Sequence, residues 1–164
     1  MISESLEALG GATFFSSLDL VSGYWQAEVE PASREKTAFI THAGLYEFIT
    51  MPFGLCNAPG TFQRLMECVL RGLTWQIALI YLDDVLVYSR TFKEHLHHLR
   101  LVFDRFRAAG LKLKPSKCHF GQRQVKYLGH VITSEGIQPD PAKIKVVQEY
   151  PVPKSVKDVR AFMG

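Results

Sequence analysis

The chain has 164 residues, of which 47% are hydrophobic and 21% are charged, and this length and composition suit one domain with a substantial core. They exclude a disordered chain, and the longest apolar stretches fall far below the roughly 20 residues that a membrane span needs. The net charge of +3 is unevenly spread, because residues 1–89 hold 4 basic and 10 acidic side chains, whereas residues 90–130 hold 10 basic and 2 acidic ones. This asymmetry favours a cation site beside a phosphate-binding surface, although a solvated helix face would give the same pattern.

The first predicted elements are short strands. The segment from Leu18 to Val29 is apolar and aromatic, is interrupted by Ser22-Gly23, and predicts a strand that turns just after Asp19. Residues 36–40 and 46–51 predict two further strands on either side of a tight turn.

A helix and a hairpin are predicted next. The helix begins at Pro59, and the apolar residues from Phe62 to Leu73 recur at helical spacing. Apolar runs at 77–82 and 85–88 then predict two strands, and the turn between them holds Asp83-Asp84.

A second helix is predicted from a capping box, Thr91 to Glu94, to a natural stop at Gly110. Its apolar face is predicted to consist of Leu96, Leu99, Val102, Phe103 and Phe106. The histidines at the start of this helix, His95, His97 and His98, have no nearby acidic partner except Glu94, and we expect them at the solvated surface.

The last third of the chain predicts short strands at 112–114 and 119–121, and a longer strand at 125–133 that ends in a turn. Residues 139–150 predict a helix, and another is expected to begin at about residue 155. This order of elements predicts the α+β class, with helices packed on one face of an antiparallel sheet.

The cysteines, Cys56, Cys68 and Cys118, are odd in number and widely spaced, and they form no CxxC pair. This spacing disfavours a disulfide framework or a zinc knuckle. Cys118 precedes His119, but nothing nearby completes the four ligands of a zinc site, so we expect a structural role for this pair.

Acidic side chains provide the strongest chemical signal. Asp83 and Asp84 lie between two apolar strands, where two neighbouring acids are electrostatically costly without a cation. Asp is also a common turn residue, so the dipeptide alone favours an ordinary turn. Asp19 ends another apolar strand, and adjacent antiparallel strands would bring it beside Asp83, forming a carboxylate site of the kind that binds magnesium.

Several segments, in order along the chain, resemble motifs of the reverse transcriptases of Gypsy-type (Ty3-like) LTR retrotransposons. The resemblance covers nearly the whole chain, and its segments are residues 14–26 (FFSSLDLVSGYWQ), 51–63 (MPFGLCNAPGTFQ), 81–84 (YLDD), 110–118 (GLKLKPSKC), 127–130 (YLGH) and 151–164. The resemblance implies a polymerase palm with a small fingers segment.

The resemblance also implies catalytic roles. Asp19 and Asp83 would bind two Mg²⁺ (or Mn²⁺) ions, the backbone carbonyl of Leu20 would complete one shell, and Asp84 would be a weaker or more indirect ligand. Tyr24 would clash with a ribose 2′-hydroxyl, although its spacing also fits a core aromatic.

Further binding residues follow from the same resemblance. Phe53 and Gly54 would line the nucleotide pocket, and retroviral relatives tend to carry Gln at the position of Phe53. The primer end would be held by Tyr127, Leu128 and Gly129. Contacts to the nucleic-acid backbone are expected from Lys112, Lys114 and Lys117, although exposed lysines are usually just solvated.

The implied organisation is a reverse transcriptase core at 1–134, with a fingers insertion at about 27–57, and the start of the thumb or connection at 135–164. The N-terminal fingers, RNase H and integrase regions are expected to lie outside this chain, as partners within a pol polyprotein. An RNA or DNA template with primer and dNTP are the implied substrates. We expect no membrane association and an intracellular location, either in a cytoplasmic virus-like particle or in the nucleus.

Three functions remain open from the sequence. The first is an RNA-directed DNA polymerase. The second is a catalytically idle palm fragment that only binds nucleic acid or a partner. The third is another two-metal palm enzyme such as a nucleotide cyclase, which the primer-grip-like and thumb-like segments disfavour because a cyclase holds no primer.

Overall fold

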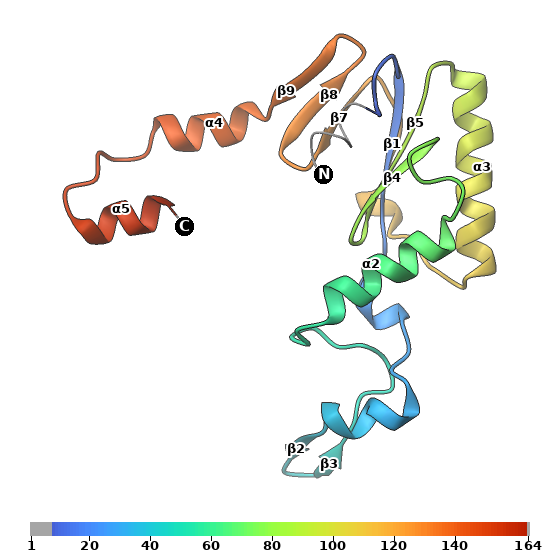
Figure 1. The fold of residues 1–164 in the computed structure, drawn as a ribbon, viewed down its shortest axis with the longest axis vertical. Coiled ribbons are helices and arrows are strands. Elements are labelled where there is room, and N and C mark those ends of the chain that lie inside the picture. Colours follow the sequence, from blue (N-terminus) through green and yellow to red (C-terminus); the bar gives the residue numbers. More distant parts are fainter. Residues whose placement is uncertain (1–7, 164) are drawn as a thin grey trace.

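The computed structural model describes residues 8–163, and Figure 1 shows them as a sheet-and-helix body with two projecting segments. Within these residues, four antiparallel strands form the main sheet in the order β4-β5-β1-β6. Their bounds are β4 (Ala78–Tyr81), β5 (Asp84–Ser89), β1 (Phe14–Asp19) and β6 (His119–Gln122). The hairpin predicted around Asp83-Asp84 is therefore confirmed.

One face of the main sheet is covered by helices α2 (Ala58–Val69) and α3 (Phe92–Ala108). Alternate strand residues such as Leu18, Val85 and Val87 share a buried cluster with the apolar side chains of these helices. The helix side chains in that cluster are Ala58, Phe62, Met66, Leu99, Val102 and Phe106. This arrangement confirms the predicted α+β class.

The opposite face of the main sheet is covered by a small sheet of β7 (Gln124–Tyr127), β8 (His130–Thr133) and β9 (Gly136–Pro139). The single strand predicted at 125–133 is wrong, because the chain reverses between β7 and β8. Leu128 and Gly129 form that turn, with φ of 47° and 78°. Leucine rarely adopts the left-handed backbone conformation, so the apolar, strand-like sequence gave no sign of a turn at this position.

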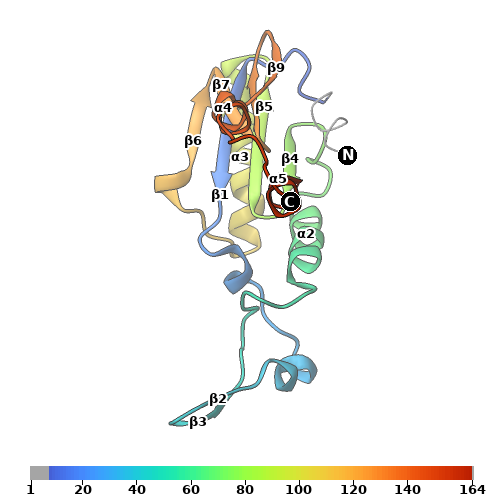
Figure 2. The same cartoon turned by 90° about the vertical axis from the view of Figure 1, so that its left-hand side faces the viewer.

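The first projecting segment carries the hairpin of β2 (Phe39–Thr41) and β3 (Gly44–Tyr46), which Figure 2 shows far from the main sheet. The hairpin was predicted, but its strands are shorter than expected because residues 31–37 form a 3-10 helix, η2 (Pro31–Thr37). The turn predicted just after Asp19 is confirmed, but the strand does not continue to Val29 beyond it. β1 ends at Asp19, Ser22 adopts a left-handed φ of 49°, and η1 (Gly23–Gln26) is a 3-10 helix.

The second projecting segment consists of α4 (Pro141–Gln148) and α5 (Val156–Met163), which extend away from the sheets in Figure 1. The expected strand at 112–114 is reduced to a single bridge between Leu113 and Leu20, followed by η3 (Pro115–Lys117). In the described part of the chain, no helix is both long and apolar enough to cross a membrane.

Helix α3 confirms the predicted capping box, because the backbone N–H of Glu94 donates to Thr91 Oγ1 at 3.3 Å and that of Thr91 donates to Glu94 Oε2 at 3.1 Å. The prediction that His95 is solvated is wrong, since its side chain is fully buried. His95 Nε2 lies 2.7 Å from the hydroxyl of Ser16, and its Nδ1 lies 2.9 Å from that of Ser89.

The predicted apolar face of α3 needs one correction. Leu96 is 54% exposed, and His95 takes the buried position beside the sheet instead. The strand serines make that possible, because a buried ring whose nitrogens are both hydrogen-bonded avoids the cost of an unsatisfied polar group.

Candidate active site

The candidate site forms where β1 and β5 meet the turn after β4. Asp19 and Asp84 are Cα partners in the β1–β5 ladder, and Asp84 also pairs with Tyr81 of β4. Asp83 lies in the turn itself, and a Cβ added at Gly23 would approach its Cβ to 3.2 Å. The three acids predicted from the sequence therefore lie at one end of the main sheet.

The turn between β4 and β5 is held by α2. Leu82 adopts a left-handed φ of 55°, and its backbone N–H donates to Gln63 Oε1 at 2.7 Å. Gln63 is held in turn, because its Nε2 donates to Glu67 Oε1 at 2.8 Å. The strained residue beside Asp83 thus has a specific side-chain partner.

The acids influence one another electrostatically. Partial burial raises the pKa of Asp84, the charges of Asp83 and Asp19 raise it further, and the ammonium of Lys117 lowers it. Burial likewise raises the pKa of Tyr127, with smaller contributions from Asp84 and Tyr81. Tyr127, from the small sheet, therefore lies within electrostatic reach of the acidic site.

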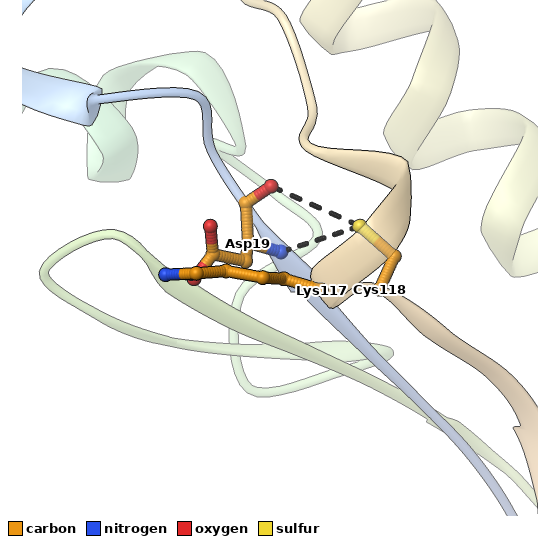
Figure 3. Close-up of polar contacts among 3 residues, drawn as sticks. All are labelled: Asp19, Lys117 and Cys118. Carbon is orange, nitrogen blue, oxygen red and sulfur yellow. Dashed lines mark hydrogen bonds and ion pairs between the residues drawn. The ribbon is translucent and has the colours of Figure 1, made fainter.

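Asp19 is contacted from one side by the segment around η3, as Figure 3 shows. Lys117 Nζ lies 3.2 Å from Asp19 Oδ2, in an ion pair whose lysine side chain is 58% exposed. The carbonyl of Asp19 accepts a backbone hydrogen bond from Lys114 at 2.8 Å, and its N–H donates to the sulfur of Cys118 at 3.5 Å. The side chain and the backbone of Asp19 thus have separate partners.

The backbone at Leu20 exposes its carbonyl on the side of β5. Val21 N–H donates to the Lys112 carbonyl, and Lys114 N–H donates to the Asp19 carbonyl. These bonds flank the Leu20–Leu113 bridge, so the bridged residues are a non-hydrogen-bonded pair whose own polar groups point away from each other. Leu20 is therefore placed to offer a carbonyl oxygen beside the acids.

The donor set of this site fits a hard divalent cation. Carboxylate and carbonyl oxygens are the ligands that Mg²⁺ prefers, and because it retains several waters it needs few protein ligands. Within residues 8–163, no group of three or more His, Cys, Asp or Glu side chains is already arranged to hold a metal ion. The ammonium of Lys117 instead supplies the cation next to Asp19, which shows that the carboxylate is accessible to a positive charge.

The predicted nucleotide residues Tyr24 and Phe53 pack together, next to Phe62. The ring of Tyr24 is half-buried, and its centroid lies 5.4 Å from that of Phe53 and 5.4 Å from that of Phe62. Phe53 is 65% exposed, and Gly54 adopts a φ of 93° with open space where a Cβ would be. Gly23 has no such space, because an added Cβ would lie 2.9 Å from the Phe62 ring and 3.2 Å from the Cβ of Asp83, so a side chain there would displace Phe62 or Asp83.

The predicted primer-grip residues form the turn between β7 and β8. Tyr127 is buried at the end of β7, and Leu128 and Gly129 are half-buried. The Gly129 carbonyl accepts a hydrogen bond from the backbone N–H of Asp140 at 3.0 Å, which links this turn to the start of α4.

The predicted backbone-binding lysines differ in their surroundings. Lys112, Lys114 and Lys117 all have exposed side chains, but only the ammonium of Lys117 is drawn into the acidic site, by its ion pair with Asp19. The side chain of Gln26 makes two hydrogen bonds to the backbone of Lys112. Its Oε1 accepts from the Lys112 N–H at 2.6 Å, and its Nε2 donates to the Lys112 carbonyl at 3.0 Å.

The sequence motifs predicted no role for Gln26 or Gln63, whereas a structural role was expected for Cys118. Gln26 and Gln63 lie inside two of the quoted motifs, but Gln26 bonds residue 112 and Gln63 bonds residue 82, across 86 and 19 positions respectively. Such long-range contacts have no periodic signal in a single sequence.

Comparisons with known proteins agree with this geometry. A family model described as "Reverse transcriptase (RNA-dependent DNA polymerase)" matches residues 2–132. The Pol polyprotein of transposon 297 from Drosophila melanogaster is 45% identical over 161 residues, which are 98% of this chain and 15% of the relative. The transposon Tf2-3 polyprotein of Schizosaccharomyces pombe is 33% identical over 164 residues, which are 100% of this chain and 12% of the relative.

Solved structures give the same result. The foamy viral protease–reverse transcriptase in complex with an RNA/DNA hybrid matches with a TM-score of 0.82 and 25% identity, over 98% of this chain and 22% of that one. The same viral protein in complex with dsDNA matches with a TM-score of 0.84 and 25% identity, over 98% and 34%. This chain spans a small part of its polyprotein relatives, and it belongs to the reverse transcriptase family, among the Pol polyproteins of Ty3/Gypsy-type retrotransposons.

Proposed function

We propose that the protein containing this chain is an RNA-directed DNA polymerase and that this chain supplies the palm with its catalytic carboxylates. The observation that carries the proposal is the pairing of Asp19 with Asp84 across β1 and β5, with Asp83 in the adjoining turn. The family membership supports the reaction, template-directed nucleotidyl transfer.

Divalent metal ions are general to reverse transcriptases, and our finer proposal is two Mg²⁺ or Mn²⁺ ions held by Asp19, Asp83 and the Leu20 carbonyl, with Asp84 acting more indirectly. The bound metals would lower the pKa of the attacking primer hydroxyl and neutralise the leaving pyrophosphate. The residues of this chain fix the geometry, because the β1–β5 ladder and the Gln63 bond to Leu82 determine where the acids lie.

The surrounding residues would select and position the substrates. Tyr24, held between Phe53 and Phe62, would restrict the space beneath the sugar, and Phe53 and Gly54 would line the nucleotide pocket. Tyr127, Leu128 and Gly129 would hold the primer end. Exposed Lys112 and Lys114 would contact the phosphate backbone, with Lys117 joining them when it leaves Asp19.

The partners follow from the relatives. Two solved neighbours are described in complex with an RNA/DNA hybrid and with dsDNA, and the sequence relatives are polyproteins. We extend both contexts to this protein, with a primed RNA or DNA template and dNTP as substrates and other Pol regions as covalent neighbours. The proposed core–thumb boundary at 134–135 lies in the turn between β8 and β9, which pair with each other.

Primer extension on an RNA template tests this proposal, using the longer Pol protein that contains this chain. Asp83→Asn should reduce extension by at least about 100-fold, because a ligand oxygen loses its charge where metal binding needs it. Asp104→Asn is the matched control, since Asp104 is exposed on α3 and pairs only with Arg107 within its own helix. Template binding, measured by filter retention, should survive in both variants. Extension by Asp83→Asn at the wild-type rate would show that Asp83 is not a catalytic ligand, and template binding without extension by the wild type would leave only the idle nucleic-acid-binding function.

A further inference from the structure

The strand that carries Asp19 lacks regular pairing on one side. β1 pairs with β5 along its whole length, but on its other edge Ser17 pairs with His119 and Leu20 bridges Leu113. Lys114 still donates its backbone N–H to the Asp19 carbonyl at 2.8 Å, but residues 115–118 leave the ladder and contain the η3 turn. The carbonyl of Asp19 therefore keeps a backbone partner on this edge, and its N–H faces the gap left by residues 115–118.

The thiol of Cys118 lies in that gap. The N–H of Asp19 donates to Cys118 Sγ at 3.5 Å, and the thiol donates to the Asp19 carbonyl at 3.8 Å. Figure 3 shows the sulfur facing both backbone atoms, while the Lys117 side chain extends along the carboxylate. Consecutive residues thus act on different parts of Asp19, with Cys118 at the backbone and Lys117 at the side chain.

The Cys118 contact with the Asp19 backbone is more rigid than the Lys117 ion pair with the Asp19 carboxylate. Cys118 is half-buried and packs against the cluster that contains Leu18 and Leu20, so its sulfur is fixed. Lys117 is 58% exposed, and an exposed ion pair is worth little and exchanges readily. An arriving cation can therefore replace the ammonium while the backbone of Asp19 stays in place.

We propose that Cys118 is a positioning residue, whose thiol completes the interrupted ladder and holds the Asp19 backbone in the conformation that binds metal. The inference rests on the proposed role of Asp19 as a metal ligand. Its physical basis is that a ligand is useful only when its backbone and rotamer are held close to the productive geometry. A thiol suits the gap because it both donates and accepts weakly.

Two substitutions separate this role from simple core packing. Cys118→Ser keeps a donor and an acceptor but loses the apolar sulfur, whereas Cys118→Val keeps the apolar volume and loses both hydrogen bonds. The backbone of Cys118 is extended, with φ of −86° and ψ of 139°, which suits valine. If Cys118 positions Asp19, Cys118→Val should weaken metal binding and Cys118→Ser should preserve it. If Cys118 only packs against the core, Cys118→Ser should lower the melting temperature more than Cys118→Val, and neither should change metal binding.

The test is titration of the 164-residue chain with Mn²⁺, followed by the electron paramagnetic resonance signal of the free ion, with thermal melting in parallel. Cys118→Val should raise the Kd for Mn²⁺ about threefold or more, and Cys118→Ser should change it less than about twofold. Cys68→Val is the matched control, because Cys68 is exposed on α2 and its thiol accepts a hydrogen bond from Arg71, away from Asp19, and it should bind as the wild type does.

The remaining outcomes count against the proposal. An unchanged Kd in Cys118→Val, or equal weakening in the serine and valine variants, overturns it. If Cys118→Val does not fold, Cys118→Ala takes its place with the same expectation, since it removes the thiol without adding bulk. Asp19→Asn should abolish the binding. Equal Mn²⁺ binding by wild type and Asp19→Asn would remove the metal role of Asp19, and this inference with it.

Discussion

Asp19 and Asp84 face each other across β1 and β5, and their mutual repulsion contributes to the raised pKa of Asp84. The fold brings these carboxylates and Asp83 to one end of the sheet, and the ammonium of Lys117 offsets part of their charge. The exposed lysine neutralises the cluster only in part. The carboxylates therefore repel one another, and a divalent cation bound between them would reduce that repulsion.

Millimolar Mg²⁺ or Mn²⁺ should raise the melting temperature of the chain, because a ligand that binds only the folded state stabilises it by mass action. The gain is about 2.7 kcal/mol when the free metal is at about 100 times Kd. The double substitution Asp19→Asn, Asp83→Asn should abolish it, whereas Asp104→Asn should retain it. Differential scanning calorimetry with and without metal measures the effect, and an equal gain in all three proteins would place the ions elsewhere.

Gln63→Met should destabilise the turn that carries Asp83, because the N–H of Leu82 loses its acceptor in a half-buried position. The expected loss in the free energy of unfolding is about 1–2 kcal/mol, measured by urea denaturation. Gln76→Met, at an exposed position after α2, is the control and should lie within about 0.5 kcal/mol of wild type. Equal stability of the two variants would show that the left-handed turn does not depend on α2.

His95 predicts a pH dependence of stability. Burial lowers its pKa below the ordinary 6.5, and the neighbouring His98 lowers it further. The folded state therefore favours the neutral ring, so this contribution is complete above the unfolded pKa and is lost as pH falls through the folded pKa. Wild type should lose more stability than His95→Gln between about pH 7 and pH 5.

Urea denaturation across that pH range measures the difference. His97→Gln is the control, because His97 is exposed on the same helix. Wild-type and His95→Gln stability curves that stay parallel through this range would contradict the buried neutral ring.

Tyr24→Val should relax sugar discrimination in the longer Pol protein. The ring of Tyr24, packed between Phe53 and Phe62, would leave no room for a 2′-hydroxyl, and valine opens that space while the metal ligands stay in place. Discrimination against ribonucleotides should fall by about tenfold or more, which corresponds to about 1.4 kcal/mol. Single-nucleotide extension with dNTP and rNTP measures it, with Tyr46→Val in the exposed hairpin as control. Unchanged discrimination would make Tyr24 a packing residue.

Much of the fold could be predicted where local signals are strong. The capping box of α3, the helical period of α2 and the two apolar runs around Asp83-Asp84 all depend on residues within a few positions of each other. Asp19 was placed near Asp83 by the expected pairing of two apolar strands, and the family resemblance supported that placement across the 64 residues that separate them.

The predictions that failed concern features that depend on the folded chain and not on local sequence. Leu128 adopts a left-handed backbone conformation that its residue type does not favour, so the strand expected at 125–133 split in two. The strand that was predicted to turn just after Asp19 does so, but residues 23–26 beyond the turn form a 3-10 helix. His95 is buried because the hydroxyl of Ser16, 79 residues away, bonds its ring. The structural role expected for Cys118 has no counterpart in its local sequence, because its thiol contacts the backbone of Asp19, 99 residues away.

Anomalous diffraction from crystals of the chain grown with Mn²⁺ tests the central claim most directly. We predict two peaks about 3.5–4 Å apart, in contact with the carboxylates of Asp19 and Asp83, as two-metal phosphoryl transfer requires. Lys117 Nζ should have left Asp19, because the metal takes over its position. Manganese peaks remote from these acids, with the Lys117–Asp19 ion pair still in place, would contradict the assignment of this end of the main sheet as a polymerase active site.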